Sequence, residues 1–174
     1  MYNLVLKNGY VIDPVNNKED YYDVAIKGGK IEEVCPKISG IKAEKTINLK
    51  GLYMCPGLID VHVHVTSKFA GPSGYRMIAK SGVTTALDFA GPIDEVLETI
   101  KKWGSGINFG CCDAVMPSLL ENIKNPTGEE IKNFIEKSIK KGAFGIKILG
   151  GHFPLTPENI RKVIEICNQK MTRN

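Results

Sequence analysis

Two histidines separated by one residue are the clearest sign of chemistry in the sequence. His62 and His64 lie in residues 58–65, a segment that is otherwise apolar apart from Asp60. Alternate residues of a β-strand share one face, so both imidazoles can converge on a single metal ion. The competing interpretation is a pair of hydrogen-bonded core histidines. Asp60 lies on the same face, where it either orients a ligating imidazole or caps a buried polar network.

A lysine in a second apolar segment is the next anomaly. Lys147 interrupts Phe-Gly-Ile-Lys-Ile-Leu at residues 144–149, and a strand covered on both sides offers its ammonium no outer aqueous face. Near the carboxyl end of the strand it can point towards the same site as the histidines. A desolvated amine can lose its proton and react with carbon dioxide, and the resulting carbamate has two oxygens for two metal ions. The alternative is a lysine that extends from a strand end into solvent.

Two further polar residues lie at or after the ends of predicted strands. Asp88 is near the end of residues 83–89, where it either faces the site or bonds to a neighbouring backbone amide, and we favour the second role. His152 follows Gly150-Gly151 and is either a substrate or metal contact or a structural part of its loop.

Hydrophobic periodicity predicts the elements that hold these residues. β-type segments come first: hairpins at residues 2–13 and 23–34, around the turn signals Asn8-Gly9 and Gly28-Gly29, and a strand near 46–53. From residue 56 onwards strands alternate with helices, which is typical of a parallel sheet with crossover helices. The four strands are expected at residues 58–65, 83–89, 107–116 and 144–149.

A helix is expected after each of these strands. Two cover residues 73–81 and 93–103, a third opens with a capping box at Thr127 and stops at Gly142, and a fourth is capped by Thr156. The residues expected in the buried stripes of the last three helices are Ile93, Val96, Leu97 and Ile100; Ile131, Phe134, Ile135 and Ile139; and Ile160, Val163, Ile164 and Cys167. Residues 168–174 are expected to form a polar tail.

The composition indicates an ordered, globular chain. Of its 174 residues 43% are hydrophobic and 24% charged, and the net charge of +4 is too mild to predict a nucleic-acid partner. No run approaches the roughly 18 apolar residues of a membrane span, and no secretory leader is visible, so we expect a cytoplasmic protein. Five scattered cysteines favour reduced thiols. Cys111 and Cys112 are adjacent and therefore point to opposite faces of their strand.

Several motifs together resemble those of the cyclic amidohydrolase group of the amidohydrolase superfamily, which includes dihydroorotases and hydantoinases. They are Leu6-Lys7-Asn8-Gly9, Asp23-Val24-Ala25-Ile26, Gly29-Lys30-Ile31, Gly82-Val83-Thr84-Thr85 and, most specifically, Pro56-Gly57-Leu58-Ile59-Asp60-Val61-His62-Val63-His64. The resemblance implies an α/β fold. Residues 1–55 would form the N-terminal part of a β-sandwich domain, and residues 56–174 the first half of a TIM-type (β/α)8 barrel, about four βα units.

The resemblance also implies roles for single residues. His62 and His64 resemble ligands of the more buried metal ion, and Lys147 resembles a carboxylated lysine that bridges two ions. Members of the group take two further histidines from the fifth and sixth strands and a proton-shuttling aspartate from the eighth. We therefore expect this chain to be incomplete and inactive by itself. Residues 65–68, Val-Thr-Ser-Lys, lack the arginine that dihydroorotases place there, which argues against a dihydroorotase.

The function implied is metal-dependent hydrolysis of carbon–nitrogen bonds, other than peptide bonds, in a small amide or cyclic amide. Zinc is the ion expected from imidazole ligands, with manganese or iron as alternatives. One other interpretation is a mononuclear relative in which Lys147 has no metal role. Another is a non-catalytic half-barrel that assembles with itself or with a partner chain. Exposed barrel edges predict self-association or homo-oligomers in each case.

Overall fold

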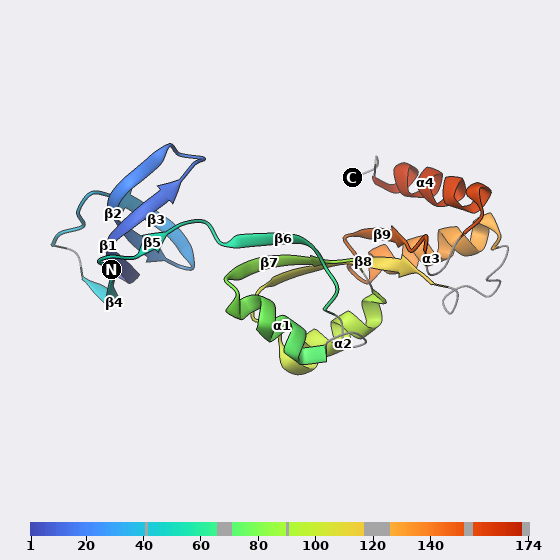
Figure 1. Ribbon diagram of the computed structural model, residues 1–174, viewed down its shortest axis with the longest axis horizontal. Helices are drawn as coiled ribbons and strands as arrows, with labels where there is room; N and C mark the ends of the chain where they lie inside the picture. Colours follow the sequence, from blue (N-terminus) through green and yellow to red (C-terminus); the bar gives the residue numbers. More distant parts are fainter. Residues whose placement is uncertain (41, 66–70, 90, 117–125, 152–154, 172–174) are drawn as a thin grey trace. The chain divides into compact units, whose positions relative to one another are not determined.

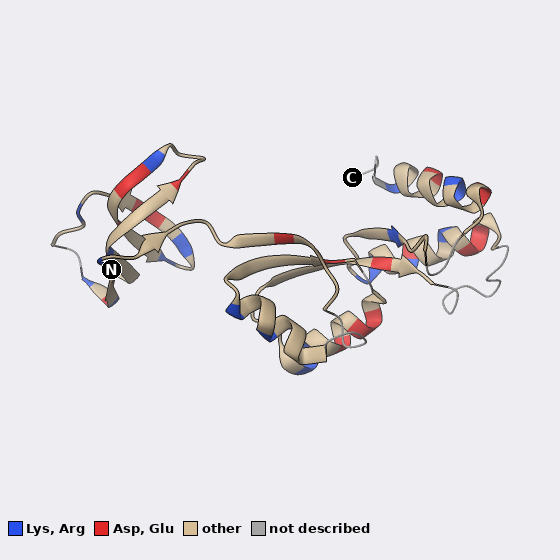
Figure 2. Ribbon diagram, viewed as in Figure 1, with Lys and Arg blue, Asp and Glu red and all other residues tan. Residues whose placement is uncertain are grey.

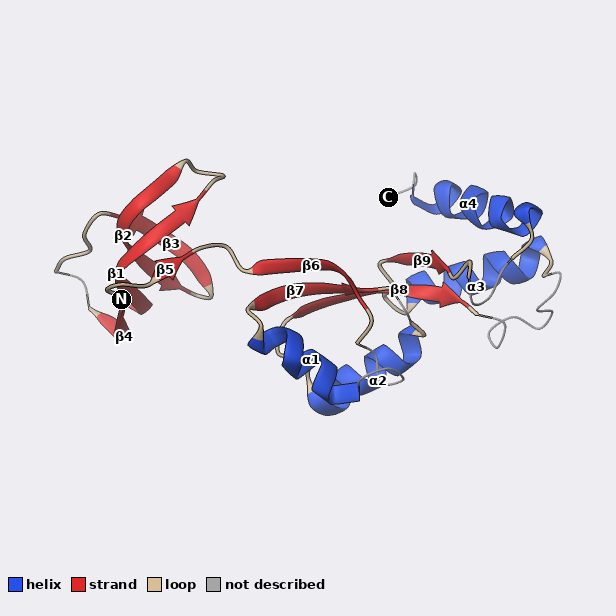
Figure 3. Ribbon diagram, viewed as in Figure 1, coloured by secondary structure: helices blue, strands red, loops and turns tan. Residues whose placement is uncertain are grey.

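The computed structural model describes residues 1–40, 42–65, 71–89, 91–116, 126–151 and 155–171. The chain divides into two compact units, Met1–Pro56 and Gly57–Asn174. Figure 1 labels the elements of each unit, and Figure 3 distinguishes their helices from their strands. Among the described residues, the first unit has strands joined by turns and loops, and helices begin in the second unit.

The first unit is a five-stranded sheet. Its strands are β1 (Tyr2–Asp13), β2 (Lys18–Lys27), β3 (Lys30–Cys35), β4 (Ala43–Asn48) and β5 (Tyr53–Met54). β3, β2 and β1 are antiparallel neighbours, whereas β4 and β5 run parallel to β1. The single strand expected near residues 46–53 is divided by a turn at Gly51, whose φ is 81°. Val5, Ala25 and Ile38 form the buried core of this sheet.

Of the two predicted hairpins, the one at Gly28-Gly29 is confirmed and the one at Asn8 is wrong. Both glycines have a positive φ, 57° and 75°, which suits a tight turn between β2 and β3. Asn8 also has a positive φ, 59°, but it lies at a bulge inside the continuous strand β1. The buried carboxylate of Asp23 accepts the backbone N–H groups of Asn8 and Ile38, each at 2.9 Å. The bulged amide is therefore satisfied without a chain reversal.

The second unit is a parallel sheet in which each strand is followed by a helix. The strands are β6 (Leu58–Val63), β7 (Val83–Asp88), β8 (Asn108–Val115) and β9 (Gly145–Ile148), in the spatial order β6-β7-β8-β9. The helices are α1 (Gly71–Lys80), α2 (Ile93–Trp103), α3 (Gly128–Lys140) and α4 (Pro157–Met171). The four predicted βα units and the α/β fold class are confirmed.

The helices of the second unit cover the face of the sheet to which Cys111 points. Cys111 of β8 packs against Ile93 and Val96 of α2, and the apolar faces of α3 and α4 pack around Ile146 and Ile148 of β9. Strand alternation then turns Cys112 and Lys147 to the opposite face. In Figure 2 the charged residues of this unit gather mainly on the helices, whereas each strand carries a single one: Asp60, Asp88, Asp113 and Lys147.

The expected helix stripes are wider than the observed ones. Leu97, Ile139 and Ile164 were expected to be buried, but 43%, 40% and 50% of their surfaces are exposed. In each of these three helices, the buried contact surface is narrower than the apolar face, so one apolar residue at its margin is exposed to solvent. The expected polar tail is also wrong in part, because α4 continues to Met171. An ion pair between Lys170 and Glu136 of α3, 2.6 Å long, ties its last turn down.

The helices that the structure describes include none long and apolar enough to cross a membrane. All five cysteines are free thiols, as expected.

Stability at high pH is predicted to depend on Cys111. Burial, reinforced by the charges of Asp88 and Asp113, raises the pKa of this thiol from 9.0 to about 12. The unfolded chain therefore releases the proton at a lower pH than the folded chain. The contribution of the Cys111 thiol to the free energy of unfolding is complete below about pH 9. It is lost as the pH rises towards 12, at roughly 1 kcal/mol per pH unit.

Urea unfolding at about pH 8 and about pH 10.5 measures this loss. Cys111→Ala should have a flatter pH dependence than the wild type, whereas Cys55→Ala, at an exposed position, should not. An equally steep dependence in Cys111→Ala would assign the loss to other groups.

Candidate metal centre

The two histidines singled out in the sequence lie side by side at the carboxyl end of β6. The ring centroids of His62 and His64 are 5.1 Å apart, with 64° between the ring planes. Two imidazoles bound to one zinc ion, with Zn–N bonds of about 2.0–2.1 Å and a near-tetrahedral angle, have centroids about 5 Å apart. The spacing and the nitrogen donors thus fit one divalent ion. Both histidines are exposed, which is not the environment of a core pair.

Lys147 comes from the other edge of the same sheet. It lies on β9 opposite Ala114 of β8, and it is half-buried. Its Nζ atom is 5.2 Å from the centroid of the Phe89 ring, and the same ring has its centroid 4.6 Å from that of His62. The fold therefore brings the lysine of β9 and a histidine of β6 to one aromatic side chain.

Two aspartates near the histidines bind the backbone. Asp60 accepts the backbone N–H of His62 at 3.2 Å through Oδ1. Asp88 is fully buried, and its Oδ2 accepts the backbone N–H of Val65 at 2.8 Å. This is the role that we favoured for Asp88 from the sequence. The hydrogen bond of Asp60 is therefore made with the backbone of the strand that carries the histidines, and not with an imidazole ring.

Other metal-binding side chains do not gather here in the part of the chain that the structure describes. Within those ranges, no three His, Cys, Asp or Glu residues lie close enough to hold an ion. His152 falls outside the described residues, as do residues 66–68. The described site therefore offers two imidazoles from the β6 segment and one amine from β9.

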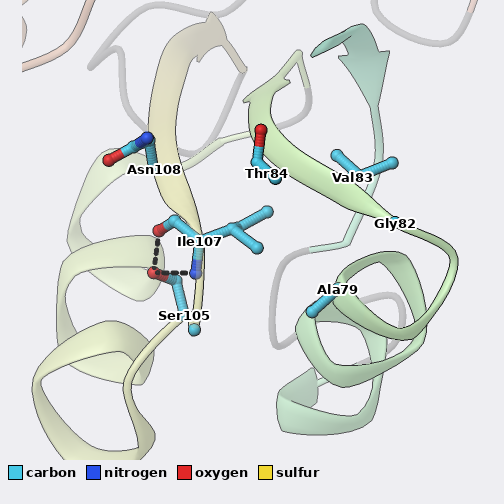
Figure 4. Close-up of a pocket in the computed structure, with 8 residues that line it drawn as sticks. Ala79, Gly82, Val83, Thr84, Ser105, Ile107 and Asn108 are labelled. Carbon is cyan, nitrogen blue, oxygen red and sulfur yellow. Dashed lines mark hydrogen bonds between the residues drawn. The ribbon is translucent and has the colours of Figure 1, made fainter. Parts of the chain in front are cut away.

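Two of the cavities lined by described residues lie along the sheet. Figure 4 shows one of about 530 Å³ at the amino ends of β7 and β8, where the side chains of Thr84, Ser105 and Asn108 line it. Ser105 donates to the carbonyl of Ile107 in its own loop. Because this cavity lies at the amino ends of the strands, it is remote from their carboxyl ends, where the candidate site lies.

The second cavity shares one residue, Phe89, with the candidate site, and neither the two histidines nor Lys147 line it. It measures about 1210 Å³, and Phe89, Cys112 and Gly145 are among the residues that line it. Its lining is mainly apolar, and Phe89 connects it to His62 and Lys147. The charged residues that line it, Glu136, Lys140 and Lys170, belong to α3 and α4 and not to the candidate site.

Two residues of importance were missed in the sequence. Phe89 directly follows β7 and contacts both expected ligands, yet an aromatic residue at a strand end has no distinctive pattern. Asp113 is 3% exposed inside β8, and a charge within an apolar strand is the same signal that identified Lys147. That signal was present in Cys-Cys-Asp-Ala-Val-Met at residues 111–116.

Comparisons with known proteins identify the family to which this sequence is related. Residues 53–172 match the family model described as the amidohydrolase family. A dihydroorotase of Aquifex aeolicus (strain VF5) is 32% identical over 177 residues, which cover 97% of this chain and 41% of the relative. An allantoinase of Enterococcus faecalis is 35% identical over 114 residues, which cover 61% of this chain and 24% of the relative.

A solved structure agrees in fold. An N-acyl-D-glutamate deacylase of Bordetella bronchiseptica, complexed with zinc and a phosphonate inhibitor, matches 97% of this chain and 43% of its own with a TM-score of 0.77 at 15% identity. The chain thus spans about two fifths of the length of the dihydroorotase and of this deacylase.

Proposed function

The chain belongs to the amidohydrolase family, and we propose that it supplies one half of a metal centre that hydrolyses carbon–nitrogen bonds in a small amide or cyclic amide. The observation that carries the proposal is the pair of imidazoles, whose centroids are 5.1 Å apart. The Phe89 ring contacts both His62 of this pair and Lys147. Two cyclic-amide hydrolases by name, a dihydroorotase and an allantoinase, are among the relatives, which supports a cyclic amide as the substrate.

His62 and His64 would hold a divalent ion through their ring nitrogens. Zinc is the ion that we propose, because imidazole suits it and because a protein of the same fold was solved with zinc. When bound there, such an ion would supply Lewis-acid chemistry, by lowering the pKa of water and polarising a carbonyl group. Asp60 and Asp88 hold the backbone that carries the two rings, so that the rings meet the ion in a fixed orientation.

Lys147 would contribute after carboxylation. Its neutral amine attacks carbon dioxide, an N–C bond forms, and the nitrogen releases one proton to give a carbamate anion. The two carbamate oxygens are then available to two ions. Further ligands and a proton-shuttling acid would be needed for turnover. The two imidazoles and one amine alone are therefore expected to bind metal weakly and to support no hydrolysis.

The absence of an arginine at residues 65–68 leads us to favour a cyclic amide other than dihydroorotate. Lys68 is a point charge and lacks the planar fork with which arginine holds a carboxylate through two hydrogen bonds.

A second candidate function is non-catalytic assembly, either of two copies of this chain or with a partner chain. Ile59 and Val61 lie on the edge strand β6 with 68% and 66% of their surfaces exposed. Exposed apolar residues along an open edge favour pairing with another strand. In this role neither metal nor a modified lysine would be required.

Metal and carbamate measurements distinguish the two functions. We expect saturable Co²⁺ binding, measured by visible absorption, and a carbamate carbon signal in ¹³C NMR after incubation with ¹³C-bicarbonate. The carbamate signal should be lost in Lys147→Ala and retained in Lys141→Ala, a lysine paired with Asp94. A chain that binds no Co²⁺ and forms no carbamate would contradict the hydrolase proposal and favour the assembly function.

A further inference from the structure

Phe89 occupies a position that links the two edges of the parallel sheet. β6 and β9 are the first and last strands in the order β6-β7-β8-β9, and neighbouring strands are separated by about 4.8 Å. Side chains from the two edges can therefore contribute to one site only if the sheet curves and something fixes the distance between them. Phe89 follows β7, and its ring contacts the ring of His62 and the amine of Lys147.

The backbone holds Phe89 firmly in this place. Its N–H donates to the carbonyl of Val63 on β6 at 3.0 Å, in the strand that carries His62. The preceding residue, Asp88, is fully buried and bonds to the N–H of Val65. Alternation along the strand directs Asp88 towards the helices and Phe89 towards the face of the histidines.

The chemistry of phenylalanine suits a positioning role. A phenyl ring has no donor atom for a metal and only two side-chain torsions, so it can restrict its neighbours without competing for the ion. The centroid distance of 4.6 Å to His62, with 39° between the planes, is a packed aromatic contact. The distance of 5.2 Å from Lys147 Nζ to the ring is within the range of a cation–π contact, which places the unmodified lysine beside the ring before it is carboxylated.

From these contacts we propose that Phe89 is a positioning residue that sets the separation and orientation of His62 and Lys147 as they receive a divalent ion. The inference rests on the proposed metal centre and deepens it. Residues that orient metal ligands typically change metal affinity 10–100-fold when they are replaced. Removal of the ring should accordingly release both side chains at once, although Phe89 binds no metal itself.

The test compares two aromatic residues on opposite faces of the same sheet. Phe89→Leu removes the ring on the histidine side, and Phe109→Leu removes a ring of β8 that packs against Tyr75 on the helix side, with centroids 4.8 Å apart. We expect Phe89→Leu to raise the Kd for Co²⁺ about 10-fold, whereas Phe109→Leu should leave it within about twofold. Phe89→Tyr keeps the ring and should restore the affinity of the wild type.

A second readout needs no metal. In the NMR spectrum of the metal-free chain, the ring of Phe89 should shift the carbon-bound protons of the His62 imidazole, and the shift should disappear in Phe89→Leu and persist in Phe109→Leu. Circular dichroism establishes that each variant is folded, and Phe89→Met, which also removes the ring, carries the test if Phe89→Leu is not folded.

Two results would overturn the positioning role of Phe89. One is an equal Co²⁺ affinity in the wild type and Phe89→Leu. The other is an equal loss of Co²⁺ affinity in Phe89→Leu and Phe109→Leu, because that would indicate a general effect on folding. A wild-type chain that fails to bind Co²⁺ would overturn the proposed metal centre as well. The failure of the metal centre is distinguishable from the failure of the Phe89 role, because it is already seen in the wild type.

Discussion

Replacement of His62 by alanine is expected to weaken Co²⁺ binding by at least about 100-fold. In the described part of the chain, the proposed nitrogen ligands are the two imidazoles, whose centroids are 5.1 Å apart. One substitution therefore removes half of the imidazole donors. Loss of a direct ligand should exceed the 10–100-fold loss that follows when a supporting residue is replaced. The dissociation constant is measured by titration with Co²⁺ and visible absorption, in which the ligand-field bands report on the donors around the ion.

The control for this prediction is Asn108→Ala. Asn108 is an exposed polar residue at the amino end of β8, where its amide donates to Thr85, remote from the carboxyl end of β6. Its Co²⁺ affinity should stay within about twofold of the wild type. His64→Ala should match His62→Ala. If both histidine variants bound Co²⁺ as tightly as the wild type, the ion would have to be held elsewhere, and the proposed centre would be wrong.

Replacement of Asp113 by alanine is expected to lower the free energy of unfolding by roughly 3 kcal/mol. The carboxylate is 3% exposed and binds two elements at once. Its Oδ1 accepts the backbone N–H of Ile93 at 3.0 Å, and its Oδ2 accepts the hydroxyl of Ser138 on α3 at 2.7 Å. Ile93 is the first residue of α2, and no side chain of the N-cap residue Pro92 caps that helix. Asp113 thus acts as its cap from β8, where a negative charge also favours the helix N-terminus.

Urea unfolding measures this effect, with two variants for comparison. Ser138→Ala removes one of the two bonds and should cost about 1 kcal/mol. Asp94→Ala removes an acidic residue from the first turn of the same helix, but its side chain is 66% exposed in an ion pair with Lys141, so the cost should be below about 1 kcal/mol. A loss in Asp113→Ala no larger than that in Asp94→Ala would show that the buried carboxylate is not the link between α2, β8 and α3.

Local signals in the sequence were sufficient for the elements of the second unit. The capping box at Thr127 is present, with the Thr127 hydroxyl accepting the N–H of Glu130 and the Glu130 carboxylate accepting the N–H of Thr127. α2 has the bounds expected for it, Ile93–Trp103. Such features depend on residues three or four positions apart, so the sequence alone expresses them. The shared face of His62 and His64 is equally local, because it follows from strand alternation.

Contacts between distant residues could not be predicted in this way. The bulge at Asn8 depends on Asp23 of the neighbouring strand, and the turn signal Asn-Gly describes both a bulge and a hairpin equally well. The exposure of Ile164 depends on which side of α4 meets α3 and β9. In both cases the prediction was wrong, because the local pattern was compatible with two outcomes and the tertiary environment selected the other one.

The sequence by itself singled out the residues that we propose for the chemistry, because an imidazole pair and a lysine are out of place in apolar strands whatever surrounds them. Only the tertiary structure decided that His62 and Lys147 share the ring of Phe89, and that Asp88 serves the backbone. The physical reason is distance along the chain: these contacts join residues of different strands, and pairing and curvature of the sheet, not sequence spacing, set how closely they approach.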